Sequence, residues 1–353
     1  MNQLLIGLVG AVLATNQPQA VSYLVQQQAG LTVNLPNPND PAEKELDQLM
    51  AGDDAAMAEV DKWIRDNNAF TAQGAGESKA ELNARIMARL DVVRKSYEDF
   101  LRRHPDFAPG HLAYASFLNN IGDEDAAKLQ NEKALQLDPK NPAAWNNLGN
   151  YYGEYGPITN AFAYFAKAIE MDPTESVYYQ NLAVTVYLYR TDAKSFYHLD
   201  EQQIFDKSLA LYRQAMRLDP DNFPLATEYA KGYYGIRPLR TNDALVAWTN
   251  TLQIAHDDIE REGVYIHLAR IKMLAGRYAG ARAQLDAVTN TMYSGLKDTL
   301  EHAITERESD ATNAPGFPTN NFITRTNSVT VVTNATAIPT NQLPAGTHQF
   351  TGL

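Results

Sequence analysis

The 353-residue sequence contains no cysteine, and this absence excludes several kinds of chemistry. Disulfide bridges, zinc sites built from thiolates, catalytic thiols and a lipid-modified N-terminal cysteine all require this residue. The compartment stays open, because a protein without cysteine can function in either redox environment.

Positive charge is also scarce. The chain carries 30 Lys and Arg against 42 Asp and Glu, which gives a net charge of −12 and a pI of about 5.1. Binding to nucleic acid requires clustered Lys and Arg that displace counterions from phosphates. The composition therefore predicts no nucleic-acid partner, and the acidic balance mainly favours solubility.

Catalytic and metal-binding motifs are missing as well. The seven histidines are scattered, without a His-x3-His pair that carries a Glu, and no Gly-x-Ser-x-Gly elbow or Walker loop occurs. We interpret His111 and His267 as packing or rim residues. Gly74-Ala75-Gly76 lacks the Gly-Lys-Ser/Thr ending of a phosphate loop and predicts a hinge. The sequence thus indicates a protein that is not an enzyme and needs no cofactor or metal.

No apolar run is long enough to span a bilayer. The run from Leu4 to Ala14 has the length of a signal-peptide core, and cleavage would fit after Ala14 or Ala20, although no Lys or Arg precedes the run. The alternative is a retained helix that packs on the protein or on another copy. We expect a periplasmic or extracellular protein if the signal is genuine, and a cytoplasmic one otherwise.

The stretch 145–173 contains an ordered set of apolar, small and proline residues. Its members are Trp145, Leu148, Gly149, Tyr152, Ala161, Phe165 and Pro173. The order and spacing resemble the tetratricopeptide repeat, a family of helical hairpins with a period of 34 residues. The stretch predicts two antiparallel helices, roughly 143–154 and 159–171, which approach closely at the small residues.

Proline spacing indicates that the hairpin is repeated. Pro105, Pro139 and Pro173 are each separated by 34 residues, the period of the resembled family. The resemblance covers about 82–288 and predicts five repeats, followed by a capping helix over 293–308. The expected fold is all-α: a superhelical solenoid of helix hairpins, with an extended N-terminal segment and a low-complexity C-terminal tail.

One repeat departs from the period. It carries 13 extra residues, at about 191–203, between its two helices, and these include Phe196, Tyr197 and His198. Asp200 and Gln203 resemble a capping box, so we expect the second helix to restart there. The aromatic residues either form a binding edge or cover neighbouring helices.

Composition divides the chain into four parts. Residues 1–20 form the signal peptide or retained helix, 21–81 a linker and N-terminal helical region, and 82–309 the solenoid with its cap. Residues 310–353 form a tail rich in Asn, Thr and Pro, which is either a disordered terminus or an arm that docks on another subunit.

By resemblance, the first helix of each repeat lines a groove in which a partner peptide lies. The residues expected to bind a partner are Asn146, Asn150, Gln180, Val184, Tyr187 and Lys231. Amide, aliphatic and phenol side chains suit an extended peptide, but the asparagines of such positions also brace the hairpins. Chaperone-binding members clamp a terminal carboxylate with basic residues, and this sequence has none at those positions.

The resemblance therefore implies a non-enzymatic scaffold for protein–protein interaction. The partner would be a protein or peptide, with other copies of the chain as a second possibility. The alternative function is a self-assembling subunit of an envelope or extracellular polymer. In that case the N-terminal segment and the threonine-rich tail would join the copies.

Overall fold

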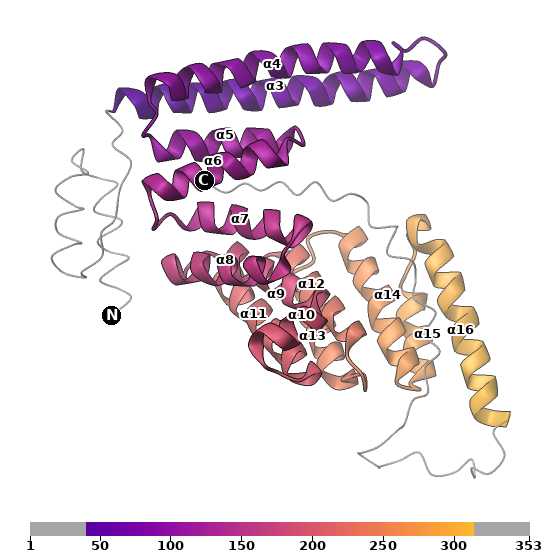
Figure 1. Cartoon of the computed structure of the whole chain (residues 1–353). Coiled ribbons are helices and arrows are strands. Elements are labelled where there is room, and N and C mark those ends of the chain that lie inside the picture. The colour runs from indigo at the N-terminus through magenta and orange to yellow at the C-terminus, as the bar shows by residue number, and fades with distance from the viewer. Residues whose placement is uncertain (1–39, 314–353) are drawn as a thin grey trace, which may run out of the picture. The chain divides into compact units, whose positions relative to one another are not determined.

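A computed structural model describes residues 40–313, and all regular structure in this range is helical (Figure 1). This confirms the all-α class of helix hairpins predicted from the sequence. The helices group into two compact units, which divide between Lys140 and Asn141. No helix within residues 40–313 has the length and apolarity needed to cross a membrane.

The first unit consists of two helical hairpins. Its helices are α3 (Pro41–Thr71), α4 (Lys79–Arg103), α5 (Ala108–Asn120) and α6 (Glu124–Leu137). Leu82, the predicted start of the repeat array, lies in the first turn of α4, which pairs with the longer α3. The first hairpin therefore includes residues that the sequence analysis assigns to the N-terminal region.

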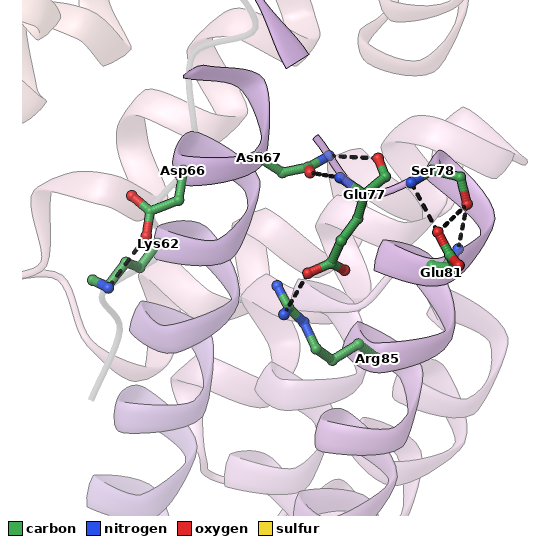
Figure 2. Close-up of polar contacts among 7 residues, drawn as sticks. All are labelled: Lys62, Asp66, Asn67, Glu77, Ser78, Glu81 and Arg85. Carbon is green, nitrogen blue, oxygen red and sulfur yellow. Dashed lines mark hydrogen bonds and ion pairs between the residues drawn. The ribbon is translucent and has the colours of Figure 1, made fainter. Parts of the chain in front are cut away.

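Polar contacts close the turn between α3 and α4 (Figure 2). The Asn67 side chain accepts a hydrogen bond from the backbone N–H of Glu77 at 2.7 Å and donates one to its carbonyl at 3.3 Å. Ser78 and Glu81 form a capping box at the start of α4, and Arg85 pairs with Glu77 at 2.7 Å. The glycine segment predicted as a hinge is the turn of a hairpin, with Gly74 at φ +76°.

A buried carboxylate lies in the core of the first unit. Asp53 is 9 % exposed and accepts a hydrogen bond from the Tyr97 hydroxyl at 3.1 Å, while its other oxygen has no partner among the described residues. The Tyr97 ring stacks on Tyr114 and Phe117. Burial raises the pKa of Asp53 to about 6, although the hydrogen bond from Tyr97 acts in the opposite direction and lowers it.

The second unit contains the remaining helices. These are α7 (Pro142–Tyr155), α8 (Ile158–Met171), α9 (Ser176–Leu188), α10 (Arg190–Tyr197), α11 (Glu201–Leu218), α12 (Phe223–Gly232), η1 (Tyr233–Gly235), α13 (Thr241–Gln253), α14 (Asp258–Leu274), α15 (Tyr278–Asp286), η2 (Thr291–Tyr293) and α16 (Ser294–Asn313). The two helices predicted for 145–173 are α7 and α8. The predicted capping helix is α16, which packs on α14 and α15.

The hairpin of α7 and α8 is closely packed because small residues lie where the helices cross. Gly149, Ala161 and Phe165 are all buried. A Cβ atom on Gly149 would lie 2.7 Å from the ring of Phe165, which is 1 % exposed and has no room to move.

We expect Gly149→Ala to lower the free energy of unfolding by about 1–3 kcal/mol, since overpacking outweighs the gain in helix propensity. Gly153→Ala, one turn later in α7, is the matched control, because its Cβ would lie 4.0 Å from that of Ala161. The control should be neutral or stabilising by up to about 1 kcal/mol. Urea unfolding of the full chain measures both, and equal effects would contradict the packing argument.

The insertion forms a short helix, α10. Phe196 and Tyr197 pack on Phe162 of α8, with ring centroids 5.3 and 5.6 Å apart, and Phe196 remains 38 % exposed. His198 ends α10 in the left-handed region at φ 55°. Asp200 and Gln203 form the predicted capping box of α11, so the second helix restarts where expected. These aromatic residues cover a neighbouring helix, while a binding role for this edge stays a prediction.

The predicted signal peptide, most of the linker and the tail beyond Asn313 lie outside the described residues. The last helix includes residues 310–313, which the sequence analysis assigns to the tail.

Candidate functional site

The residues predicted to bind a partner lie on the first helices of successive hairpins, α7, α9 and α12. A fourth first helix, α14, continues the series. The predicted residues, and the contacts described in the next paragraphs, lie on one side of these four helices. We call this side the A face. The second helices α8, α11, α13 and α15 each pack on the first helix of their own hairpin.

Two side-chain contacts join α7 to α9. Asn181 donates a hydrogen bond to the side-chain oxygen of Asn146 at 2.9 Å, and the Tyr189 hydroxyl donates one to the Gly153 carbonyl at 2.9 Å. Asn146 is only 4 % exposed, so its side chain braces the two helices. This agrees with the second interpretation of the asparagines, in which they hold the hairpins together. Asn150, one turn later, is partly exposed.

A third contact joins α9 to α12. The amide of Gln180 donates a hydrogen bond to the Glu228 carboxylate at 2.9 Å, and both side chains are partly exposed. Val184, one turn further along α9, packs against the cluster that contains Ala183 and Leu225 and is also only partly buried. Gln180 and Val184 thus share one face of α9, and their binding of a partner stays a prediction.

Tyr187 lies at the C-terminal end of α9. Its ring lies 5.9 Å from Phe205, and the guanidinium carbon of Arg190 lies 5.3 Å from its centroid. Burial raises the pKa of the Tyr187 hydroxyl, which approaches Gly235 so closely that a methyl group there would overlap it. The close approach of Tyr187 thus requires glycine in η1.

An aromatic stack connects η1, α13 and α14. The His267 imidazole lies flat on Trp248, with centroids 4.0 Å apart and planes at 9°, and its Nδ1 is 3.1 Å from the Tyr234 hydroxyl. Burial, helped by the charges of Lys231 and Arg270, lowers the pKa of His267 to about 3. The imidazole is therefore neutral near pH 7, and it packs as the sequence analysis predicted.

The sequence analysis selected Lys231 but missed Arg270. Each of the two directly follows a small residue, Ala230 or Ala269, that recurs in the first helix of each repeat. Two other predicted residues directly follow the equivalent Gly149 and Ala183. The four equivalent positions are Asn150 in α7, Val184 in α9, Lys231 in α12 and Arg270 in α14. Alignment of the repeats on Gly149, Ala183, Ala230 and Ala269 is the signal that would have found Arg270.

Within residues 40–313, no group of three or more His, Asp or Glu side chains could hold a metal ion. The contacts on the A face are hydrogen bonds, ring contacts and packing. Chemically, this face can bind another molecule through amide groups, apolar carbons and cationic side chains.

Comparison with known proteins matches one short stretch of the chain to a family. Residues 131–156, which run from the second half of α6 through α7, match the family model described as tetratricopeptide repeat. The RNA polymerase-associated protein CTR9 of Caenorhabditis elegans is 22 % identical over 191 residues, which cover 50 % of this chain and 16 % of that protein. The chain therefore matches only about a sixth of the length of this relative.

The comparison with solved structures gave matches at low sequence identity. The crystal structure of YrrB, described as a TPR protein with an unusual peptide-binding site, is 13 % identical, covers 59 % of this chain and 99 % of its own, and has a TM-score of 0.46. PilW, described as a widely conserved type IV pilus biogenesis factor, is 18 % identical, with coverages of 60 % and 91 % and a TM-score of 0.47.

Proposed function

We propose that the chain is a non-catalytic tetratricopeptide-repeat scaffold that binds a segment of another protein on the A face. The observation that carries the proposal is a row of hydrogen bonds that joins α7 to α9, α9 to α12, and η1, which directly follows α12, to α14. These contacts link Asn146 to Asn181, Gln180 to Glu228 and Tyr234 to His267.

Such a row holds the four helices in a fixed arrangement before any partner arrives. A preorganised surface loses little conformational entropy on binding, which favours affinity. Asn150, Gln180 and Val184 remain partly exposed on this surface and offer amide groups and an apolar patch. An extended segment could use both kinds of contact.

The test begins with a phage library of random dodecapeptides, selected on the immobilised full chain. Affinity for enriched peptides is then measured by fluorescence anisotropy on the wild type and on the double variant Asn150→Ala/Gln180→Ala. We expect the double variant to bind about tenfold more weakly, because two amide contacts are worth about 1–2 kcal/mol together.

The matched control is Lys167→Ala/Arg213→Ala, which alters exposed residues on the second helices α8 and α11. It should bind as the wild type does, and thermal melting verifies that both variants are folded. Equal affinity of the A-face variant, the control and the wild type would refute the assignment of the site.

Two further parts of this proposal concern the segments outside the described residues. Export depends on cleavage of the predicted signal, which mass spectrometry of the mature N-terminus measures directly. The alternative function, self-assembly through the N-terminal segment and the tail, predicts a larger particle for the full chain than for a chain that ends at Ser309. Light scattering that finds monomers in both would exclude that alternative.

A further inference from the structure

The A face carries cations that lack carboxylate partners. No carboxylate of a described residue lies within ion-pair distance of Lys231 in α12 or Arg270 in α14, and the same holds for Arg237 in the loop that follows η1. Other cations of the chain do form such pairs, as shown by Arg85 with Glu77, Arg89 with Glu59, Arg94 with Asp123, Arg240 with Asp206 and Arg282 with Glu308. Other described cations also lack an ion pair, and what distinguishes Lys231 and Arg270 is that both lie close to His267.

Two arginines near this group contact tyrosine rings. The guanidinium carbon of Arg270 is 5.9 Å from the Tyr234 centroid. That of Arg190 is 5.3 Å from the Tyr187 centroid, and Arg190 also lies 4.0 Å from the Glu201 carboxylate. The Tyr187 hydroxyl approaches Gly235, the residue after Tyr234. Arg237 donates to the carbonyls of Tyr234 and Ile236, which orients its guanidinium without neutralising it.

From this arrangement we propose that the segment bound on the A face is acidic, and that its Asp or Glu side chains pair with Lys231 and Arg270. The inference rests on the proposed function, since it specifies the chemistry of the partner for the same site. Apolar side chains of the segment would contact Tyr187 and Tyr234 between the charges.

The equivalence of the repeats supports this pairing. Lys231 and Arg270 occupy the same position in successive first helices, the position held by Asn150 and Val184 in α7 and α9. A segment that crosses the first helices in order would therefore meet amide and apolar side chains first and two cations afterwards. Glu228, the nearest acidic side chain on α12, is held by Gln180 and forms no ion pair with Lys231.

The chain's own terminal segments do not supply the acid. Residues 1–39 contain no Asp or Glu, and residues 314–353 contain none either. In this proposal the acidic side chains belong to another molecule. This recognition differs from a clamp for a terminal carboxylate, because it uses side-chain carboxylates and the helices α12 and α14.

The experiment uses the dodecapeptides enriched on the full chain and two variants that remove equal charge. Lys231→Gln/Arg270→Gln alters the A face, and Arg213→Gln/Arg217→Gln alters exposed residues of α11. We expect the enriched peptides to be rich in Asp and Glu, and the A-face variant to bind them about tenfold more weakly. The α11 variant should bind within about twofold of the wild type, and added salt should weaken the wild-type complex.

Other outcomes overturn the inference in distinguishable ways. In one outcome, the enriched peptides lack acidic residues, and Asn150→Ala/Gln180→Ala lowers the affinity for them while Lys231→Gln/Arg270→Gln does not. This result would overturn the acidic partner and leave the proposed function intact. If neither variant lowers the affinity for the enriched peptides, both proposals are overturned. Salt-sensitive self-association, abolished by Lys231→Gln/Arg270→Gln in light scattering, would mean that a second copy occupies the face and would overturn an acidic peptide as the partner.

Discussion

Between pH 7 and pH 5, the second unit is expected to lose about 2 kcal/mol of unfolding free energy through His267 alone. The folded-state pKa of about 3 lies below the unfolded value of 6.5. Between pH 6.5 and pH 3, His267 is therefore protonated in the unfolded chain and neutral in the folded chain. The stability that this group gives is complete above pH 6.5 and is lost as the pH falls towards 3. The pKa is low because the imidazole is packed on Trp248 and faces the charges of Lys231 and Arg270.

Urea unfolding of the full chain at pH 7 and pH 5 measures this effect, with Trp fluorescence and peptide-level hydrogen exchange to assign it to the second unit. His267→Phe keeps a ring on Trp248 but cannot titrate, so its stability should depend less on pH, by about 2 kcal/mol over this range. His302→Gln, at an exposed position of α16, is the control and should behave as the wild type. An unchanged pH dependence in His267→Phe would show that the imidazole is not buried as described.

Replacement of Asp53 by Asn is expected to stabilise the first unit by about 2 kcal/mol at pH 7.5. Burial raises the folded-state pKa of Asp53 from 3.8 to about 6, so the folded chain holds the proton more tightly than the unfolded chain. The stability that this group gives is complete below pH 3.8 and is lost as the pH rises through 6. Asn can still accept the Tyr97 hydrogen bond and carries no charge into the core.

The stabilisation should shrink to a few tenths of a kcal/mol at pH 4, because Asp53 is then protonated in the folded wild type. Asp54→Asn, at the exposed neighbouring position, removes the same charge and should change stability by less than about 0.5 kcal/mol. Urea unfolding with hydrogen exchange in α3 and α4 reports the first unit. A loss of stability in Asp53→Asn at pH 7.5 would refute the description of Asp53 as a buried, charged group without sufficient partners.

The repeated hairpins were predictable because their determinants are local. Proline spacing, small residues at helix crossings and the Asp200–Gln203 capping box each depend on a short stretch of sequence, and the structure confirms them. The side-chain row on α9 was predictable for the same reason, since one helical turn fixes which residues share a face. Gln180 and Val184 lie where that rule places them.

Contacts between distant residues could not be predicted in this way. Asn146 is buried because Asn181, 35 residues later, binds its side chain. The hairpin turn at Gly74–Gly76 depends on Asn67 reaching Glu77, and the neutral state of His267 depends on Trp248 in another helix. In each case burial or charge is set by a residue whose position only the tertiary structure provides.

Hydrogen exchange of the full chain with and without an enriched dodecapeptide tests the central claim most directly. Binding on the A face stabilises the helices that contact the peptide, so exchange should slow in α9, α12 and α14. Exchange in the second helices α8, α11 and α13 should change less. Protection confined to those second helices, or to the α3 and α4 hairpin, would contradict the account.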